Sequence, residues 1–279
     1  MKWSSGGRSG NLEDRRGMGG LGKGMGIGGG LIMLVLSLIF GPGILSDSGD
    51  SGVPQTTANG EVASSPEEEK LADFVSFVLD DVQQTWSKIL SDRRVPYRDA
   101  KLVLFRDMTQ SGCGTAQSTM GPFYCPLDEK VYVDLGFYDE LRRRFGAPGD
   151  FAQAYVIAHE LGHHVQHMLG IDEQTRRAQQ GNPQMANALS VRLELQADCY
   201  AGVWGASAAK RDKLDPGDVD EGLNAAASVG DDRLQRKSTG RVNTESFTHG
   251  SAEQRAAWFR RGFTSGSPDQ CDTFGDRGP

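Results

Sequence analysis

Residues 159–163 read His-Glu-Leu-Gly-His and lie in a largely apolar stretch, Ala154 to Gly170, that is expected to be helical. On a helix, His159 and His163 lie one turn apart on the same face, so their imidazole nitrogens can bind one metal ion. Glu160 lies beside them, where its carboxylate can take a proton from a water bound to that metal. The pattern predicts a helix that binds zinc and carries a general base.

Two histidines leave the predicted zinc site incomplete. One class of zinc sites has a third His ten residues after the first, but Leu169 occupies that position here. The other common third ligand is a Glu from a second helix. The segment Met185–Ala208 has a helical face of small residues interrupted by Glu194 and Asp198. Ionised carboxylates on a buried face need partners, so we predict Glu194 as the third ligand and Asp198 as the hydrogen-bond acceptor of His159. A solvated acidic pair is the alternative explanation.

Longer strings of unusual sequence are spread along the chain, and they include these two helices. They are Asn11-Leu-Glu-Asp-Arg-Arg-Gly17, Ser111-Gly-Cys-Gly-Thr-Ala-Gln-Ser-Thr-Met-Gly-Pro-Phe-Tyr-Cys-Pro126, the His159 motif, Glu194-Leu-Gln-Ala-Asp-Cys199 and Thr248-His-Gly-Ser-Ala-Glu-Gln-Arg255. Together they resemble the bacterial membrane-anchored neutral zinc metallopeptidases of the YpfJ type. The resemblance implies an α+β, zincin-like domain with a zinc helix and a Glu-ligand helix, preceded by a single transmembrane helix.

The first 65 residues differ in composition from the rest of the chain. Residues 1–25 are rich in glycine and charge and are predicted to be a disordered tail on the cytoplasmic side. Residues 26–45 carry no charge and have about the length of a membrane-spanning helix, which we expect to be a retained anchor because no signal-peptide cleavage site follows. Residues 46–65 predict a flexible linker, and the zinc metallopeptidase domain is expected over residues 66–279.

The charge distribution predicts orientation and partners. Five basic residues precede the apolar segment, whereas the first basic residue after it is Lys70. This asymmetry predicts a single-pass protein of the cytoplasmic membrane, with the N-terminus inside and the catalytic domain periplasmic or extracytoplasmic. The chain has a net charge of −7, which argues against nucleic acid as a partner. The expected partners are the membrane and a protein or peptide substrate, with one zinc ion as the sole cofactor.

All four cysteines lie beyond the apolar segment, and four cysteines allow three pairings. Such an even set is typical of a domain outside the cytoplasm. We predict a short loop closed by Cys113 and Cys125, and a bond between Cys199 and Cys271 that ties the Glu194 helix to the C-terminus. A cysteine zinc site is the alternative, but the sequence contains no C-x-x-C pair.

The remaining elements follow from capping signals, periodicity and strand-forming residues. A Gln-rich polar connection joins the zinc helix to the Glu194 helix. The predicted elements are a helix from Ser65 to about Leu90, strands at Lys101–Phe105 and Lys130–Leu135, a short helix at Asp139–Phe145, the zinc helix at Asp150–Leu169 and a last helix at Ser251–Phe263.

Three histidines lie outside the predicted ligand pair. His249 is the only one that lies outside the zinc helix, and we predict that it stabilises the oxyanion of the reaction, with Tyr155 and Arg255 as the next candidates. A surface His that caps the last helix is the alternative for His249. His164 points away from the ligand face and is predicted to be a packing or surface residue, whereas His167 is expected at the rim of the site.

These features predict a membrane-anchored endopeptidase that hydrolyses peptide bonds outside the cytoplasmic membrane, with its zinc-bound water activated by Glu160. The strand Lys130–Leu135 is expected either to pair with an extended substrate or to belong to the core. A zinc-dependent amidase acting on a non-protein substrate would use the same metal chemistry, and a non-catalytic zinc-binding envelope module is a third possibility. Glu160 argues against the third, because a structural zinc site needs no base beside it.

Overall fold

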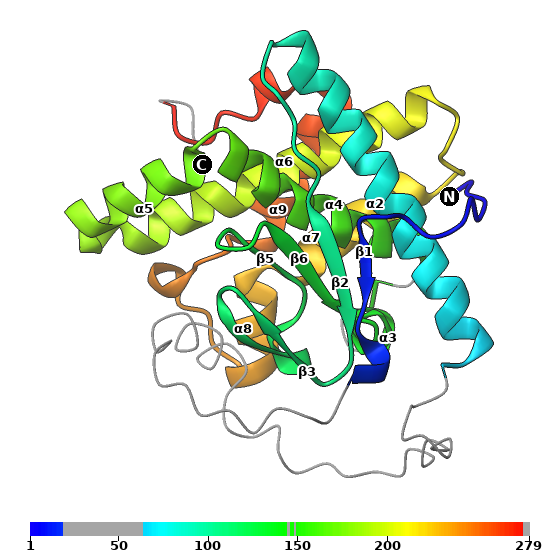
Figure 1. The fold of residues 1–279 in the computed structure, drawn as a ribbon. Coiled ribbons are helices and arrows are strands. Elements are labelled where there is room, and N and C mark those ends of the chain that lie inside the picture. The colour runs from blue at the N-terminus through cyan, green and yellow to red at the C-terminus, as the bar shows by residue number, and fades with distance from the viewer. Residues whose placement is uncertain (19–63, 144–145, 148, 276–279) are drawn as a thin grey trace.

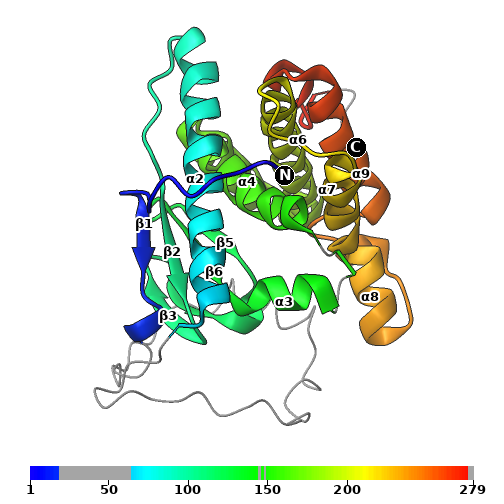
Figure 2. The same ribbon diagram turned by 90° about the vertical axis from the view of Figure 1, so that its right-hand side faces the viewer.

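The structure is a computed structural model that describes residues 1–18, 64–143, 146, 147 and 149–275. A small sheet and the long helix α2 lie on one side of the molecule, and a group of helices lies on the other, with α4 between them (Figures 1 and 2). The helices are α2 (Pro66–Asp92), α3 (Gly136–Arg143), α4 (Asp150–Met168), α5 (Ile171–Gly181), α6 (Ala186–Lys210), α7 (Asp218–Ser228), α8 (Asp231–Thr239) and α9 (Ala252–Ser265).

Most predicted helices are present with ends that differ by a few residues. Helix α2 begins at the expected cap, where Ser65 and Glu68 form a reciprocal capping box. The Gln-rich polar connection, for which no helix was predicted, forms helix α5, which projects from the body together with the first turns of α6 (Figure 1). Gln, Arg and Ala are good helix formers, so a polar composition did not exclude a helix there.

The sheet has four strands in the order β1-β2-β6-β5. The first three are parallel and β5 is antiparallel to β6. Strand β6 has β2 on one side, and its residues 130–132 have β5 on the other. These three residues cannot pair with a substrate, so the expectation of such pairing was wrong for this part of Lys130–Leu135. The strands are β1 (Leu12–Asp14), β2 (Lys101–Phe105), β5 (Phe123–Cys125) and β6 (Lys130–Asp134), with a separate hairpin of β3 (Met108–Ser111) and β4 (Gly114–Gln117).

Residues 1–18 are packed on the domain, which corrects the expectation of a disordered tail for this part of residues 1–25. Strand β1 pairs with β2, and the Trp3 ring contacts the Phe74 ring edge-on at a centroid distance of 5.3 Å. The buried Arg16 guanidinium donates to the carboxylates of Asp14 and Glu69. A few apolar and charged side chains of this glycine-rich segment therefore contact α2 and β2. The composition of the segment does not predict these contacts.

The pairing of β1 with β2 also constrains the membrane topology. The predicted anchor, residues 26–45, and most of the predicted linker lie outside the described residues. None of the helices in the described ranges combines the length and apolar composition needed to span a bilayer. Two hydrogen-bonded strands have to lie on the same side of a membrane. The crossing by residues 26–45, its orientation and the location of the domain stay predictions, and any membrane topology has to leave β1 and β2 together on one side.

Both predicted disulfides are confirmed. Cys113, in the turn of the β3–β4 hairpin, is bonded to Cys125 at the end of β5. Cys199 of α6 is bonded to Cys271 near the C-terminus. No cysteine of the described residues is free, and all four belong to this pair of bonds.

Helices α6 and α9 cross closely because glycines lie at the crossing. A Cβ atom at Gly262 would lie 1.9 Å from the Cys199 carbonyl oxygen, and one at Gly202 would lie 2.1 Å from the Phe259 carbonyl oxygen. Since these neighbours are backbone atoms, they cannot move aside without separating the helices. The close crossing brings Arg255 of α9 to α6.

Replacing Trp3 with Ala tests whether the N-terminal residues belong to the domain. We expect the free energy of unfolding to fall by about 2 kcal/mol, because the half-buried indole packs on α2. Chemical denaturation of the full chain measures this change, with Leu127→Ala as a control at an exposed site. An unchanged unfolding midpoint for Trp3→Ala would mean that the N-terminal residues are detached in solution.

Gly262→Ala tests the close crossing of α6 and α9. The added methyl group has to push two backbones apart, so we expect a loss of at least about 3 kcal/mol in unfolding free energy. Gly181→Ala is the matched control, because a Cβ atom there meets nothing within 4 Å. Equal stability of the two variants would contradict the close helix spacing as the reason for these glycines.

Candidate metal centre

The three predicted metal ligands meet between α4 and α6. The Nε2 atom of His159 lies 3.1 Å from one carboxylate oxygen of Glu194, and the Nε2 atom of His163 lies 3.5 Å from the other. One ligand atom from each residue lies within 4.8 Å of the other two. The one-turn spacing on α4 thus places both imidazoles against a single carboxylate of α6.

Asp198 fixes the orientation of His159, one turn along α6 from Glu194. Its Oδ1 atom lies 2.9 Å from His159 Nδ1, and because an ionised carboxylate only accepts, Nδ1 carries the proton of this bond. Burial lowers the pKa of His159, but the charge of Asp198 and the hydrogen bonds to Asp198 and Glu194 outweigh this and raise the pKa to about 10. A metal ion would replace the proton on Nε2, the atom that faces Glu194.

Tyr155 and Arg255 also donate to Asp198, and this corrects their expected role as oxyanion donors. The Tyr155 hydroxyl donates to Oδ1, and Arg255 donates from Nε to Oδ2 at 2.8 Å and from Nη2 to Oδ1 at 2.9 Å. Burial raises the pKa of the Asp198 carboxyl, but Arg255 and His159 outweigh this and hold the pKa below its ordinary value. Both side chains are therefore committed to the carboxylate that orients His159.

Glu160 is buried beside the ligands, with only 8% of its surface exposed. No hydrogen bond among the described residues involves its carboxylate, so both oxygens are available to a water or a substrate. Burial raises the pKa of the Glu160 carboxyl above its ordinary value, which makes it a stronger base.

His249 follows α8 in a loop that Asp231 organises. The Asp231 Oδ2 atom accepts from the backbone N–H groups of Thr248, His249 and Gly250 at 2.7, 2.7 and 3.0 Å. Its Oδ1 atom lies 3.3 Å from His249 Nδ1. Burial lowers the pKa of His249, but Glu194 and Asp231 outweigh this and raise the pKa above its ordinary value. Asp231 was not identified from the sequence as a residue of the site, because the sequence around Asp231 carries no signal that it contacts residues 248–250.

His164 was expected to be either a packing or a surface residue, and the structure shows that it is a buried packing residue. Its Nε2 atom lies 2.7 Å from the Arg98 carbonyl oxygen, which only accepts, so Nε2 is protonated and Nδ1 accepts from the Tyr124 hydroxyl at 3.0 Å. Burial lowers its pKa, consistent with a neutral ring. His167 lies 2.8 Å from Asp172 and does not join the ligand group.

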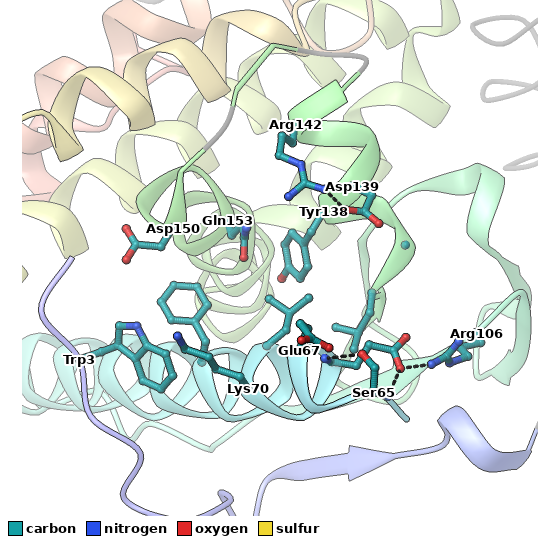
Figure 3. A pocket seen from close by; sticks show the side chains of 15 residues that line it. Trp3, Ser65, Glu67, Lys70, Arg106, Tyr138, Asp139, Arg142, Asp150 and Gln153 are labelled. Atoms are coloured by element: carbon teal, nitrogen blue, oxygen red, sulfur yellow. Dashed lines mark hydrogen bonds and ion pairs between the residues drawn. The ribbon is translucent and has the colours of Figure 1, made fainter. Parts of the chain in front are cut away.

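A cavity of about 880 Å³ lies between α2, α3 and the start of α4 (Figure 3). None of the three candidate ligands lines it. Its walls combine apolar side chains such as Trp3 and Phe74 with ion pairs such as Arg142–Asp139. The Tyr138 hydroxyl on its wall has no hydrogen-bond partner among the described residues. The candidate ligands are therefore not part of the cavity wall, although burial, together with the charge of Glu160, raises the pKa of the Tyr138 hydroxyl on that wall.

The donor set of the candidate metal centre fits zinc. Two imidazole nitrogens and one carboxylate oxygen are ligands that zinc prefers in catalytic sites, where three protein ligands leave one position open. A second group, Asp150, Asp218 and Glu221, contains oxygen donors only, and two of its carboxylates contact the Met1 amino group. The group that contains both histidines is therefore the one suited to zinc.

The chain as a whole is similar in sequence to known proteins. The family model described as "Putative neutral zinc metallopeptidase" matches residues 1–274. The uncharacterized protein YpfJ of Escherichia coli K12 is 49% identical over 284 residues, which cover 99% of each chain. The uncharacterized protein Mb2605 of Mycobacterium bovis is 47% identical over 204 residues, which cover 69% of this chain and 67% of the relative. No solved structure matches the chain. The chain therefore belongs to the neutral zinc metallopeptidase family that this model describes.

Proposed function

We propose that the protein is a zinc-dependent endopeptidase that cleaves peptide bonds outside the cytoplasm and uses Glu160 as its general base. The observation that carries this proposal is the buried carboxylate of Glu160, which lies beside His159 and His163 and has no hydrogen-bond partner among the described residues. A site that served only to stabilise the fold would close its metal with four protein ligands and would not keep such a carboxylate unpaired.

The chain's own residues would divide the work of hydrolysis. His159, His163 and Glu194 would hold the zinc, which supplies a positive charge that polarises the scissile carbonyl and acidifies water. Glu160 takes a proton from the attacking water and passes it to the leaving amine. The raised pKa of its carboxyl favours both transfers near neutral pH.

His249 is the proposed donor to the oxyanion that forms during attack. Against the effect of burial, the negative charges of Glu194 and Asp231 raise the pKa of His249 above its ordinary value, so the ring interacts electrostatically with one of the candidate ligands. With Asp231 bound at Nδ1, the other nitrogen, Nε2, remains to donate to the substrate. The 29% exposure of its side chain leaves it accessible.

Strand β5 is the proposed binding strand for the substrate backbone. Within the described residues it has a neighbour on one side only, and the bond from Tyr124 to His164 fastens it to α4. The free edge of such a strand presents N–H and C=O groups that can pair with an extended peptide. A peptide bound there would lie along the zinc helix.

We also propose that the enzyme works in an oxidising compartment and is attached to the cytoplasmic membrane through residues 26–45. The two disulfides support this location, because such bonds persist outside the cytoplasm. Because β1 pairs with β2, residues 1–18 would lie on the same side of the membrane as the domain in this proposal.

Glu160→Gln tests the proposed chemistry. We expect the wild type loaded with zinc to cleave peptides in a proteome-derived library and the variant to lose at least about 10²-fold in kcat, because the amide cannot accept the proton. Mass spectrometry of the library reads cleavage, and metal analysis checks that both proteins hold one zinc. If neither protein cleaves while both hold zinc, the peptidase proposal fails and hydrolysis of another amide bond becomes the better explanation.

His249→Ala tests the proposed oxyanion donor. We expect kcat to fall about 10²- to 10³-fold with a small change in KM, because the donor acts on charge that develops during the reaction. His167→Ala is the matched control, since His167 lies on α4 but outside the ligand group. Full activity of the His249 variant would remove this residue from the mechanism.

A further inference from the structure

We propose that the Cys199–Cys271 disulfide holds the ligand His163 in its metal-binding orientation, acting through the side chains of Gln196 and Gln166. The two glutamines are then positioning residues. This inference rests on the metal centre of the proposed function, but not on the reaction catalysed there.

The first step is the contact between His163 and Gln166. The Gln166 Oε1 atom lies 2.8 Å from His163 Nδ1, and Gln166 is completely buried. Its Nε2 atom lies 2.7 Å from the Leu193 carbonyl oxygen, which can only accept. The amide nitrogen is thereby fixed toward α6, and the amide oxygen is fixed toward the imidazole.

The second step connects Gln166 to the C-terminal segment. Gln166 Nε2 also donates to Gln196 Oε1 at 3.0 Å, and Gln196 Nε2 donates to the Cys271 carbonyl oxygen at 3.0 Å. Gln196 is buried as well. The Cys271 carbonyl therefore sets the orientation of the Gln196 amide, and the Gln196 amide in turn supports the orientation of the Gln166 amide.

The orientation of the Gln166 amide decides which nitrogen of His163 can bind a metal. With its oxygen toward Nδ1, the proton of the neutral imidazole lies on Nδ1, and the lone pair of Nε2 faces Glu194. A rotated amide would place its NH₂ group against Nδ1 and favour the proton on Nε2. That tautomer cannot bind a metal through Nε2.

The third step is the placement of the Cys271 carbonyl. Cys271 is bonded to Cys199 on α6. The residues after it are held by hydrogen bonds from Thr273 Oγ1 to the Arg192 carbonyl oxygen at 2.6 Å and from Arg192 Nη1 to the Phe274 carbonyl oxygen at 3.2 Å. The disulfide is thus the covalent attachment of the segment that supplies the carbonyl.

The two histidine ligands differ in the kind of hydrogen-bond partner that fixes their tautomer. The partner of His159 is a carboxylate, Asp198, both oxygens of which accept, so either orientation gives the same tautomer. The partner of His163 is an amide with an acceptor at one end and a donor at the other. An amide has to be oriented by further contacts, and the Leu193 carbonyl and the Gln196 side chain supply them together.

Zinc affinity of the full chain tests the inference, measured by competition with a chromophoric chelator. Gln166→Met should weaken zinc binding about 10- to 100-fold, the range found when the partner of a ligating histidine is removed. Gln196→Met and the double variant Cys199→Ala, Cys271→Ala should each weaken it about 3- to 10-fold. The matched control is Cys113→Ala with Cys125→Ala, which removes the other disulfide and should leave the affinity within about twofold.

Combining the variants separates a specific effect from general loosening of the fold. If the disulfide acts through Gln196, removing it in the Gln196→Met background should cause no further loss of zinc affinity. Additive losses, or an unchanged affinity without the disulfide, would overturn the inference. If the cysteine variant unfolds, the zinc affinity of Gln196→Met decides the test, because this variant keeps the disulfide. An unchanged zinc affinity of Gln196→Met would then overturn the inference.

These outcomes are distinguishable from failure of the proposed function. A wild type that binds zinc but cleaves no peptide refutes the peptidase proposal, while the affinities of the variants still decide the role of the disulfide. A wild type that binds no zinc refutes both.

Discussion

The structure around the metal centre depends on one fully buried carboxylate, Asp198. A charge without solvent is costly unless donors surround it, and here Arg255, Tyr155 and His159 all donate to it. These donors come from α4 and α9, so the ion pair joins both helices to α6. The glycines at the α6–α9 crossing are needed for the same reason, because a wider crossing would carry Arg255 away from the carboxylate.

The parts of the site that could be predicted from the sequence are those whose signal lies within one helix. The spacing of His159 and His163, and of Glu194 and Asp198, describes helix faces directly. Asp231 and Gln196 could not be found this way, because they act through contacts with residues distant in the sequence. Tyr155 and Arg255 were expected in the site with another role, since the sequence does not show which acceptor a donor reaches.

The fold was predictable to a similar extent and for the same reason. Helices with caps and apolar faces were expected close to their observed positions, as at Ser65. Strand β1 was not expected, because three residues in a glycine-rich string carry little intrinsic strand preference and are ordered by β2. The position of β6 inside the sheet likewise depends on strand order, which no local pattern specifies.

The parallel pairing of β1 with β2 has a consequence for the order of folding. Leu12 pairs with Leu102, ninety residues later, whereas His159 and Glu194 are 35 residues apart and are joined by the α5–α6 hairpin. Closing the longer loop costs about 0.8 kcal/mol more chain entropy for a contact of only three residue pairs. We therefore expect the helical half to assemble before β1 pairs with β2, and β1 to be released before the helices on unfolding.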